Sequence, residues 1–166
     1  MAERVPPSGG IQEAVEAARS LKRVLIVGEH NPHSRDGRLA LHPFPPGAAG
    51  ARLCRILGME PREYLRAFDR VNLLNSRRWD AKQARRSAGR ITHRRRILLG
   101  SRVAAAHEVK FIPFRVQVLY DINVDGKPYV RILVLPHPSG RCRVWNDPAA
   151  AVRARVAVER FLKETA

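Results

Sequence analysis

The apolar run at residues 24–27, Val-Leu-Ile-Val, constrains the fold more than any other part of the sequence. Polar and apolar residues do not alternate in it, so it predicts a strand covered on both faces, as in a parallel sheet. Further strands are predicted at 70–74, 96–100, 114–120 and 129–135. Helical patterns separate most of these strands. This alternation predicts an α/β fold, a three-layer α/β/α sandwich around a short, mostly parallel central sheet.

Local signals mark the ends of several predicted helices. Gly58 is a typical left-handed stop for the preceding helix, and Pro61 is favoured at a first helical position. Ser101 is predicted to cap one helix at its N-terminus, and Asp147 before Pro148 to cap another. The sequence thus predicts helices over 11–21, 47–57, 61–68, 80–92, 101–107 and 147–162.

The length of 166 residues predicts one domain with a sizeable core. Residues 1–10 are rich in Pro and Gly and are predicted to form a flexible leader, which leaves 11–166 as the single domain. The Asp125-Gly126 pair predicts a tight turn between two strands. The polar, Pro-rich stretch 29–46 is too long for an idle connection, so we expect it to be functional.

The strong positive charge of the chain indicates what kind of partner it binds. The chain has 31 Lys and Arg against 15 Asp and Glu, a net charge of +16, which indicates a polyanionic partner, normally nucleic acid. The segment 77–96 holds nine Lys and Arg and a single acid, Asp80. It is predicted to contact nucleic-acid phosphates or, alternatively, to be a solvated helix face. The cations that we expect to make such contacts there are Arg77, Arg78, Lys82, Arg85 and Arg86.

Composition also limits the compartment and the cofactors. No stretch approaches the roughly 18 apolar residues of a membrane span, so we expect no membrane contact. Cys54 and Cys142 cannot supply a four-ligand zinc or iron–sulfur site, and they indicate free thiols in a reducing compartment. Glu29, His30 and Asp36 match no metal-ligand spacing. We therefore expect a monomer without metal or cofactor in the cytoplasm of a bacterial, archaeal or phage-infected cell, at the nucleoid when acting.

The clearest motif is Leu135-Pro136-His137-Pro138-Ser139-Gly140, at the end of a predicted strand. The two prolines hold His137 on a stiff, extended turn. Polar residues follow other predicted strands too: Glu29, His30 and Asn31 after the first, Asn72 and Asn75 around the second. The carboxyl ends of parallel strands lie at one edge of a sheet, so these segments are predicted to converge on one crevice.

The order of these motifs resembles the uracil-DNA glycosylase superfamily. The resemblance runs from about Val24 to Phe161. It consists of Val-Gly-Glu at a first strand end, Pro43-Phe44 followed by Gly-Ala-Ala-Gly-Ala-Arg-Leu at 47–53, an Asn-bearing strand, Leu-Leu-Gly at 98–100, and His-Pro-Ser-Gly at 137–140. It implies the superfamily's α/β/α sandwich with a four-stranded parallel sheet. The chain lacks the cysteines of the iron–sulfur branch.

The resemblance also implies residue roles. His137 would donate to the O2 atom of the departing base, and Glu29, Asn31 or His30 would position the water or stabilise the developing sugar cation. Phe44 would stack on the extruded base, and Asn72, with Asn75 as a substitute, would read its edge. Ser139 of the same motif would also bind the base.

The segment after the motif lies where the superfamily inserts a loop into the minor groove. Arg141, Arg143, Val144 and Trp145 are therefore expected to contact DNA, with an apolar wedge among them. Structural alternatives stay open: Phe44 as ordinary core, Asn72 as a strand-end hydrogen bonder, and Trp145 as a helix-packing anchor.

The sequence thus predicts a DNA glycosylase that hydrolyses the N-glycosidic bond of uracil, or of a related damaged or modified pyrimidine, flipped out of single- or double-stranded DNA. Such an enzyme needs donors aimed at the base oxygen and a pocket for the flipped base. A second hypothesis is a catalytically weak or inactive member that binds modified or abasic DNA. A third, which explains the charge alone, is a basic RNA-binding protein.

Overall fold

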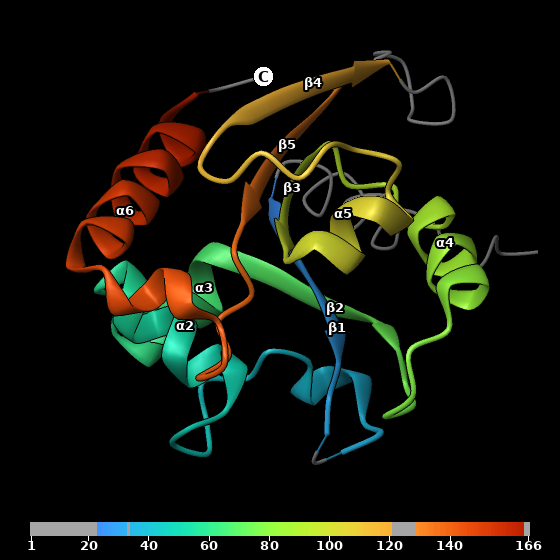
Figure 1. Ribbon diagram of the computed structural model, residues 1–166, viewed down its shortest axis with the longest axis horizontal. Helices are drawn as coiled ribbons and strands as arrows, with labels where there is room; N and C mark the ends of the chain where they lie inside the picture. The colour runs from blue at the N-terminus through green and yellow to red at the C-terminus, as the bar shows by residue number, and fades with distance from the viewer. Residues whose placement is uncertain (1–22, 33, 121–128, 165–166) are drawn as a thin grey trace, which may run out of the picture.

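A computed structural model describes residues 23–32, 34–120 and 129–164 (Figure 1). The described chain is an α/β protein built on one five-stranded sheet in the order β2-β1-β3-β5-β4. Four strands run parallel, and β4 is antiparallel to β5 at one edge. The strands are β1 (Val24–His30), β2 (Phe68–Leu74), β3 (Arg95–Leu99), β4 (Val116–Tyr120) and β5 (Tyr129–Leu135).

The expected count of four strands was wrong because β4 joins the sheet. Four parallel strands are present, and β4 pairs with β5 as the other arm of a hairpin. Its side chains are half-buried or exposed, with Val118 and Tyr120 among the exposed ones, as is typical of an edge strand. The predicted turn at Asp125-Gly126 lies outside the described residues, as do the leader 1–10 and the helix over 11–21.

Helices cover both faces of the sheet (Figure 1). They are α2 (Ala49–Leu57), α3 (Pro61–Ala67), α4 (Ala81–Gly89), α5 (Ser101–Ala106) and α6 (Pro148–Lys163), with short 3₁₀ turns η1 (Gly37–Leu39) and η2 (Arg143–Asn146). The carboxylates of Asp80 and Asp147 accept backbone N–H bonds at the starts of α4 and α6. The chain caps α5 with Gly100, so the prediction of Ser101 as the cap was wrong.

Two apolar cores give the three layers. Val24 and Ile26 of β1 point into one core with α2, α3 and α6, while Leu25 and Val27 point into the other with α4 and α5. This is the period-two alternation of a strand buried on both faces, as the unbroken apolar run predicted. Within the described ranges, no helix is long and apolar enough to cross a membrane.

Candidate active site

A cavity of about 350 Å³ opens at the carboxyl ends of the parallel strands. That volume lies within the roughly 300–1,000 Å³ of small-ligand sites. Its walls come from the end of β1 and the following loop, the start of α2, one residue of β2, and the turn after β5. They consist of Glu29, His30, Asn31, Pro32, Ser34, Leu39, Leu41, His42, Phe44, Pro45, Gly47, Ala48, Ala49, Gly50, Arg52, Asn72, His137, Pro138 and Ser139.

Backbone contacts fix the position of His137. Pro136 and Pro138 on either side of it are buried, and the Trp145 indole N–H donates to the His137 carbonyl oxygen over 2.9 Å. Gly100, the residue after β3, lies next to the His137 side chain. A Cβ on Gly100 would lie 3.2 Å from the Cβ of His137, and its φ of +93° is one that side-chain-bearing residues rarely adopt. Glycine at this position therefore lets the two strand ends approach closely.

The surroundings of the His137 imidazole favour its neutral form. Burial lowers its pKa below the usual value of 6.5, the Glu29 carboxylate acts in the opposite direction, and His30 and Arg102 add to the lowering. A neutral imidazole carries one N–H, so it donates one hydrogen bond and accepts one at the other nitrogen. The cavity thus holds a neutral donor next to a carboxylate.

Glu29 belongs to a chain of contacts that the sequence analysis missed. Its side chain is only 16% exposed and forms an ion pair with Arg102 over 3.6 Å. The Arg102 guanidinium in turn lies 5.8 Å from the ring centroid of Trp79, a cation–π distance. Arg102 is the second residue of α5 and Trp79 precedes α4, so no local spacing links either residue to Glu29.

Two polar atoms of the cavity residues are buried without a hydrogen-bond partner in the described part of the chain. They are Nδ1 of His30 and Oδ1 of Asn72. Asn72 lies beside Gly28 in the parallel register of β1 and β2. A buried unpaired acceptor costs about 1–3 kcal/mol, so such atoms suit a ligand that supplies the missing partner. The structural role for Asn72 as a strand-end hydrogen bonder does not explain its unpaired oxygen.

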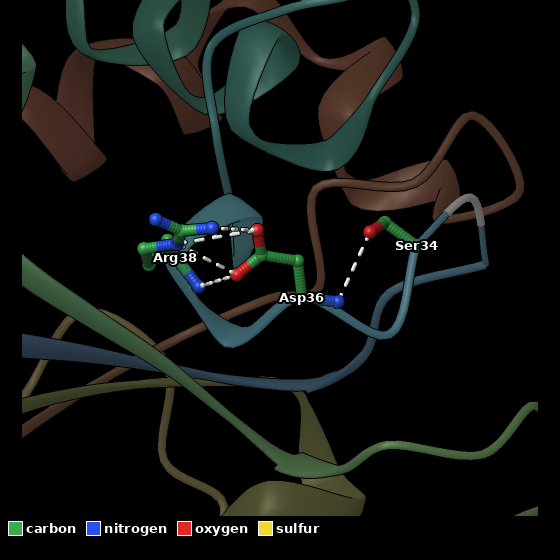
Figure 2. A network of polar contacts seen from close by, with 3 residues as sticks. All are labelled: Ser34, Asp36 and Arg38. Atoms are coloured by element: carbon green, nitrogen blue, oxygen red, sulfur yellow. Dashed lines mark hydrogen bonds and ion pairs between the residues drawn. The ribbon is translucent and has the colours of Figure 1, made fainter.

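The loop after β1 is ordered by its own side chains. The Asn31 amide donates to the Leu39 carbonyl oxygen over 3.2 Å. Figure 2 shows the Asp36 carboxylate accepting bonds from the Arg38 guanidinium, while the Asp36 N–H donates to the Ser34 hydroxyl over 3.0 Å. Those Arg38 contacts lower the pKa of Asp36. Its carboxylate is therefore engaged within the loop.

Phe44 lines the cavity with an exposed ring. The side chain is 57% exposed, so the alternative of an ordinary core residue does not apply. His42, a second residue that the sequence analysis missed, lies 5.9 Å away between ring centroids, and its Nδ1 accepts the Phe44 backbone N–H over 3.3 Å. That bond places the proton of a neutral His42 on Nε2.

The structure brings most of the predicted catalytic and base-binding residues together. Glu29, His30, Asn31, Phe44, Asn72, His137 and Ser139 all line the cavity. Asn75 does not, and it is exposed beyond the end of β2. Nothing in its local sequence separates it from Asn72, which has the same residue type three positions earlier.

The predicted DNA-contacting residues lie outside the cavity. Arg141, Arg143 and Val144 are exposed, whereas Trp145 is half-buried and packs edge-on against Phe114. Trp145 thus holds the turn after β5 through this ring contact and its bond to the His137 carbonyl oxygen, and its contact with DNA stays a prediction. The cations of the basic segment, Arg77, Arg78, Lys82, Arg85 and Arg86, are all exposed at or before α4.

Among the described residues, no three His, Cys, Asp or Glu side chains come together as a metal site. Cys54 and Cys142 are free thiols. Fold and site together define an α/β protein whose cavity, at the carboxyl edge of the sheet, combines a largely apolar surface with a few polar side chains. No protein-family model matches the sequence, and no curated protein matches it closely enough to identify a relative.

Proposed function

We propose that this chain is a DNA glycosylase that removes uracil, or a related damaged or modified pyrimidine, from DNA. The observation that carries the proposal is the cavity, which a half-buried His137 with a lowered pKa lines together with the Glu29 carboxylate and with Asn72, whose Oδ1 has no partner among the described residues. A glycosylase of the uracil-DNA glycosylase type, with its α/β/α sandwich, needs this combination of groups.

The chemistry explains why. Hydrolysis breaks the bond between C1′ of the sugar and the base nitrogen, and the bonding electrons leave with the base. Negative charge therefore builds on the base oxygen while positive charge builds at the sugar. A preorganised N–H donor aimed at that oxygen is worth roughly 10²- to 10³-fold in rate. His137 supplies such a donor without itself carrying a charge.

The other half of the reaction needs an acceptor near C1′. A water molecule attacks there and loses a proton, which ultimately balances the charge on the released base. Glu29, Asn31 and His30 are the candidates to position this water, because all three line the same cavity. Glu29 supplies the only negative charge among the three, and that charge also stabilises an oxocarbenium-like sugar.

The cavity also suits recognition of a flipped base. An exposed aromatic ring gives a stacking surface, which is worth about 1–3 kcal/mol per base. Phe44 provides it at the rim, and the Asn72 amide lies deeper. The Asn72 side-chain oxygen is a hydrogen-bond acceptor, and the N3–H of uracil is a matching donor. The net charge of +16 supplies attraction to the phosphate backbone.

One observation favours the second hypothesis, a catalytically weak protein that binds modified or abasic DNA. The Glu29 carboxylate is paired with Arg102 at 3.6 Å, and this pairing reduces its strength as an acceptor. Tight binding of abasic-site duplex without any base release would support that role. A preference for structured RNA over duplex DNA in competition would instead support an RNA-binding protein.

The proposal is tested with oligonucleotides containing uracil, hydroxymethyluracil or hypoxanthine, each incubated with the protein and then treated with alkali. We expect strand scission at one or more of these bases and none at an unmodified control. The panel also identifies the substrate base. Absence of scission on every member would overturn the enzyme proposal.

A further inference from the structure

A second hollow, of about 430 Å³, lies directly beside the candidate active site. Its walls consist of Arg52, Arg55, Ile56, Pro138, Ser139, Gly140, Trp145 and Ala151. Arg52, Pro138 and Ser139 line both spaces. The hollow is therefore separated from the cavity only by the turn that carries His137 and by one arginine.

Arg52 is placed to act in both spaces. It belongs to α2 and is half-buried, and no hydrogen bond or ion pair engages its guanidinium within the described part of the chain. Its nitrogens are not among the buried unpartnered atoms of the described residues, so they stay accessible from the adjoining spaces. A guanidinium that is accessible and unengaged at the junction of two hollows is available to bind an anionic ligand.

The turn after His137 is shaped around this guanidinium. A Cβ built on Gly140 would lie 2.5 Å from Nη1 and 3.0 Å from Nη2 of Arg52. The Arg52 side chain thus lies flat against the Gly140 backbone, and any other residue at 140 would push it aside. The displaced atoms are the far end of a flexible side chain, so the backbone itself need not move.

The chemistry of the hollow suits a phosphodiester. Among the described residues that line it, Arg52 and Arg55 are the only charged ones, and none is an acid. Arg155 holds the adjoining end of α2 by donating to the Ile56 carbonyl oxygen over 2.8 Å. A guanidinium offers a planar fork that binds two phosphate oxygens at once. Ile56, Pro138 and Trp145 supply apolar surface for the deoxyribose.

We propose that Arg52 binds the phosphodiester next to the extruded nucleotide, with the base in the cavity and the backbone in the adjoining hollow. The inference rests on the proposed action on DNA. It adds a phosphate-binding residue and a binding site outside the basic segment 77–96. Arg52 would hold the DNA backbone at a fixed distance from His137, because Arg52 lies against Gly140 and His137 belongs to the same short turn.

The test uses a duplex with one tetrahydrofuran abasic site, which the protein cannot turn over. In a second set of duplexes, single methylphosphonate linkages replace the phosphates on either side of that site. Affinity is measured by fluorescence anisotropy across a salt series for wild type, Arg52→Ala, Arg52→Lys and Gly140→Ala. Gly89→Ala is the matched control, because a Cβ there meets nothing within 4 Å.

We expect Arg52→Ala to weaken binding about tenfold and to reduce the salt slope by about 0.9, the value for one lost phosphate contact. One methylphosphonate position should weaken wild type similarly and leave Arg52→Ala unaffected. Arg52→Lys should lose less DNA affinity than Arg52→Ala, since lysine keeps the positive charge but lacks the planar, two-pronged guanidinium. Gly140→Ala should weaken binding several-fold with an unchanged melting temperature, and Gly89→Ala should match wild type.

The outcomes separate the two proposals. If wild type binds the duplex but Arg52→Ala keeps both its salt slope and its sensitivity to every methylphosphonate, the Arg52 inference is wrong and the glycosylase proposal stands. If wild type does not bind the duplex at all, the proposed action on DNA fails and takes this inference with it.

Discussion

The cavity at the carboxyl edge and the basic helix α4 both contain residues that the sequence singled out, yet they differ physically. The cavity gathers side chains from four distant segments, and two of their buried polar atoms lack partners. On α4, Lys82, Arg85 and Arg86 are close in sequence and exposed. Arg85 has an exposed partner, Glu108, at 3.7 Å, a pair worth little.

We infer from this difference that the cavity acts in the chemical step, whereas α4 acts in the electrostatic attraction of DNA. A buried donor acts in a site from which water is partly excluded, so its removal affects a reaction strongly. An exposed cation acts at long range, is screened by salt and is replaceable by its neighbours. We therefore expect substitutions in the cavity to change the rate of base release, and substitutions on α4 to change mainly the salt dependence of binding.

The largest effect is expected from His137→Ala. The cleavage rate should fall by roughly 10²- to 10³-fold, because one preorganised donor to the departing base is lost. DNA affinity should barely change, since the phosphate contacts lie elsewhere. Single-turnover rates and anisotropy measure the two quantities separately, and His93→Ala, outside the cavity, serves as the control. Cleavage by His137→Ala at the wild-type rate would remove the main catalytic assignment.

The pH dependence of cleavage should reflect the lowered pKa of His137. The neutral imidazole is the expected donor, and it persists at every pH above the folded-state pKa, which lies below 6.5. The single-turnover rate should therefore stay flat around neutral pH and fall only as the pH drops through this lowered pKa, about tenfold per pH unit once His137 is protonated. A rate that instead declines as pH rises above 6.5, and loses this decline in His137→Ala, would mean that the imidazolium is active.

Phe44→Ala should cost roughly 1–3 kcal/mol in binding of the flipped base, because a stacking surface disappears. The ring is 57% exposed, so the fold should lose little stability. The measurement is the concentration of enzyme that gives half-maximal single-turnover rate. Phe111→Ala is the control, because Phe111 is also exposed, at 42%, but does not line the cavity. Equal effects of the two substitutions would argue against stacking by Phe44.

The smallest effect on chemistry is expected on α4. A double Lys82→Ala, Arg86→Ala variant should reduce the salt slope of DNA binding by about one to two units. Excision at saturating enzyme should stay nearly unchanged. The control is Arg160→Ala with Lys163→Ala, in the last turn of α6, because neither residue lines the cavity. An unchanged slope in the α4 variant would make that segment a solvated face and transfer the groove contacts to Arg141 and Arg143.

The sequence predicted the parts of the fold that local physics determines. The unbroken apolar runs predicted strands buried on both faces. Gly58 ends α2 with a left-handed φ of 65°, and Asp147 caps α6, both as predicted. The convergence of His137 with the end of β1 followed from parallel strands sharing one edge.

What the sequence could not predict depends on long-range contacts. Arg52 lies against Gly140 and Arg102 pairs with Glu29, and no spacing along the chain reveals such pairs. Ser101 was a better cap by residue type, but Gly100 occupies that position because the chain needs a positive φ beside His137. The number of strands in the sheet also depended on pairing between β4 and β5, which periodicity alone does not fix.

The most direct test of the central claim, that the carboxyl-edge cavity hydrolyses an N-glycosidic bond, is to quantify the free base released from a uracil-containing oligonucleotide. Mass spectrometry of the small-molecule fraction, together with a count of abasic sites, gives both products of the reaction. We expect free base and abasic sites in equal amounts, both with wild type and with the α4 double variant. His137→Ala should release the base roughly 10²- to 10³-fold more slowly. Equal release by His137→Ala and wild type, or no free base from any modified oligonucleotide, would contradict it.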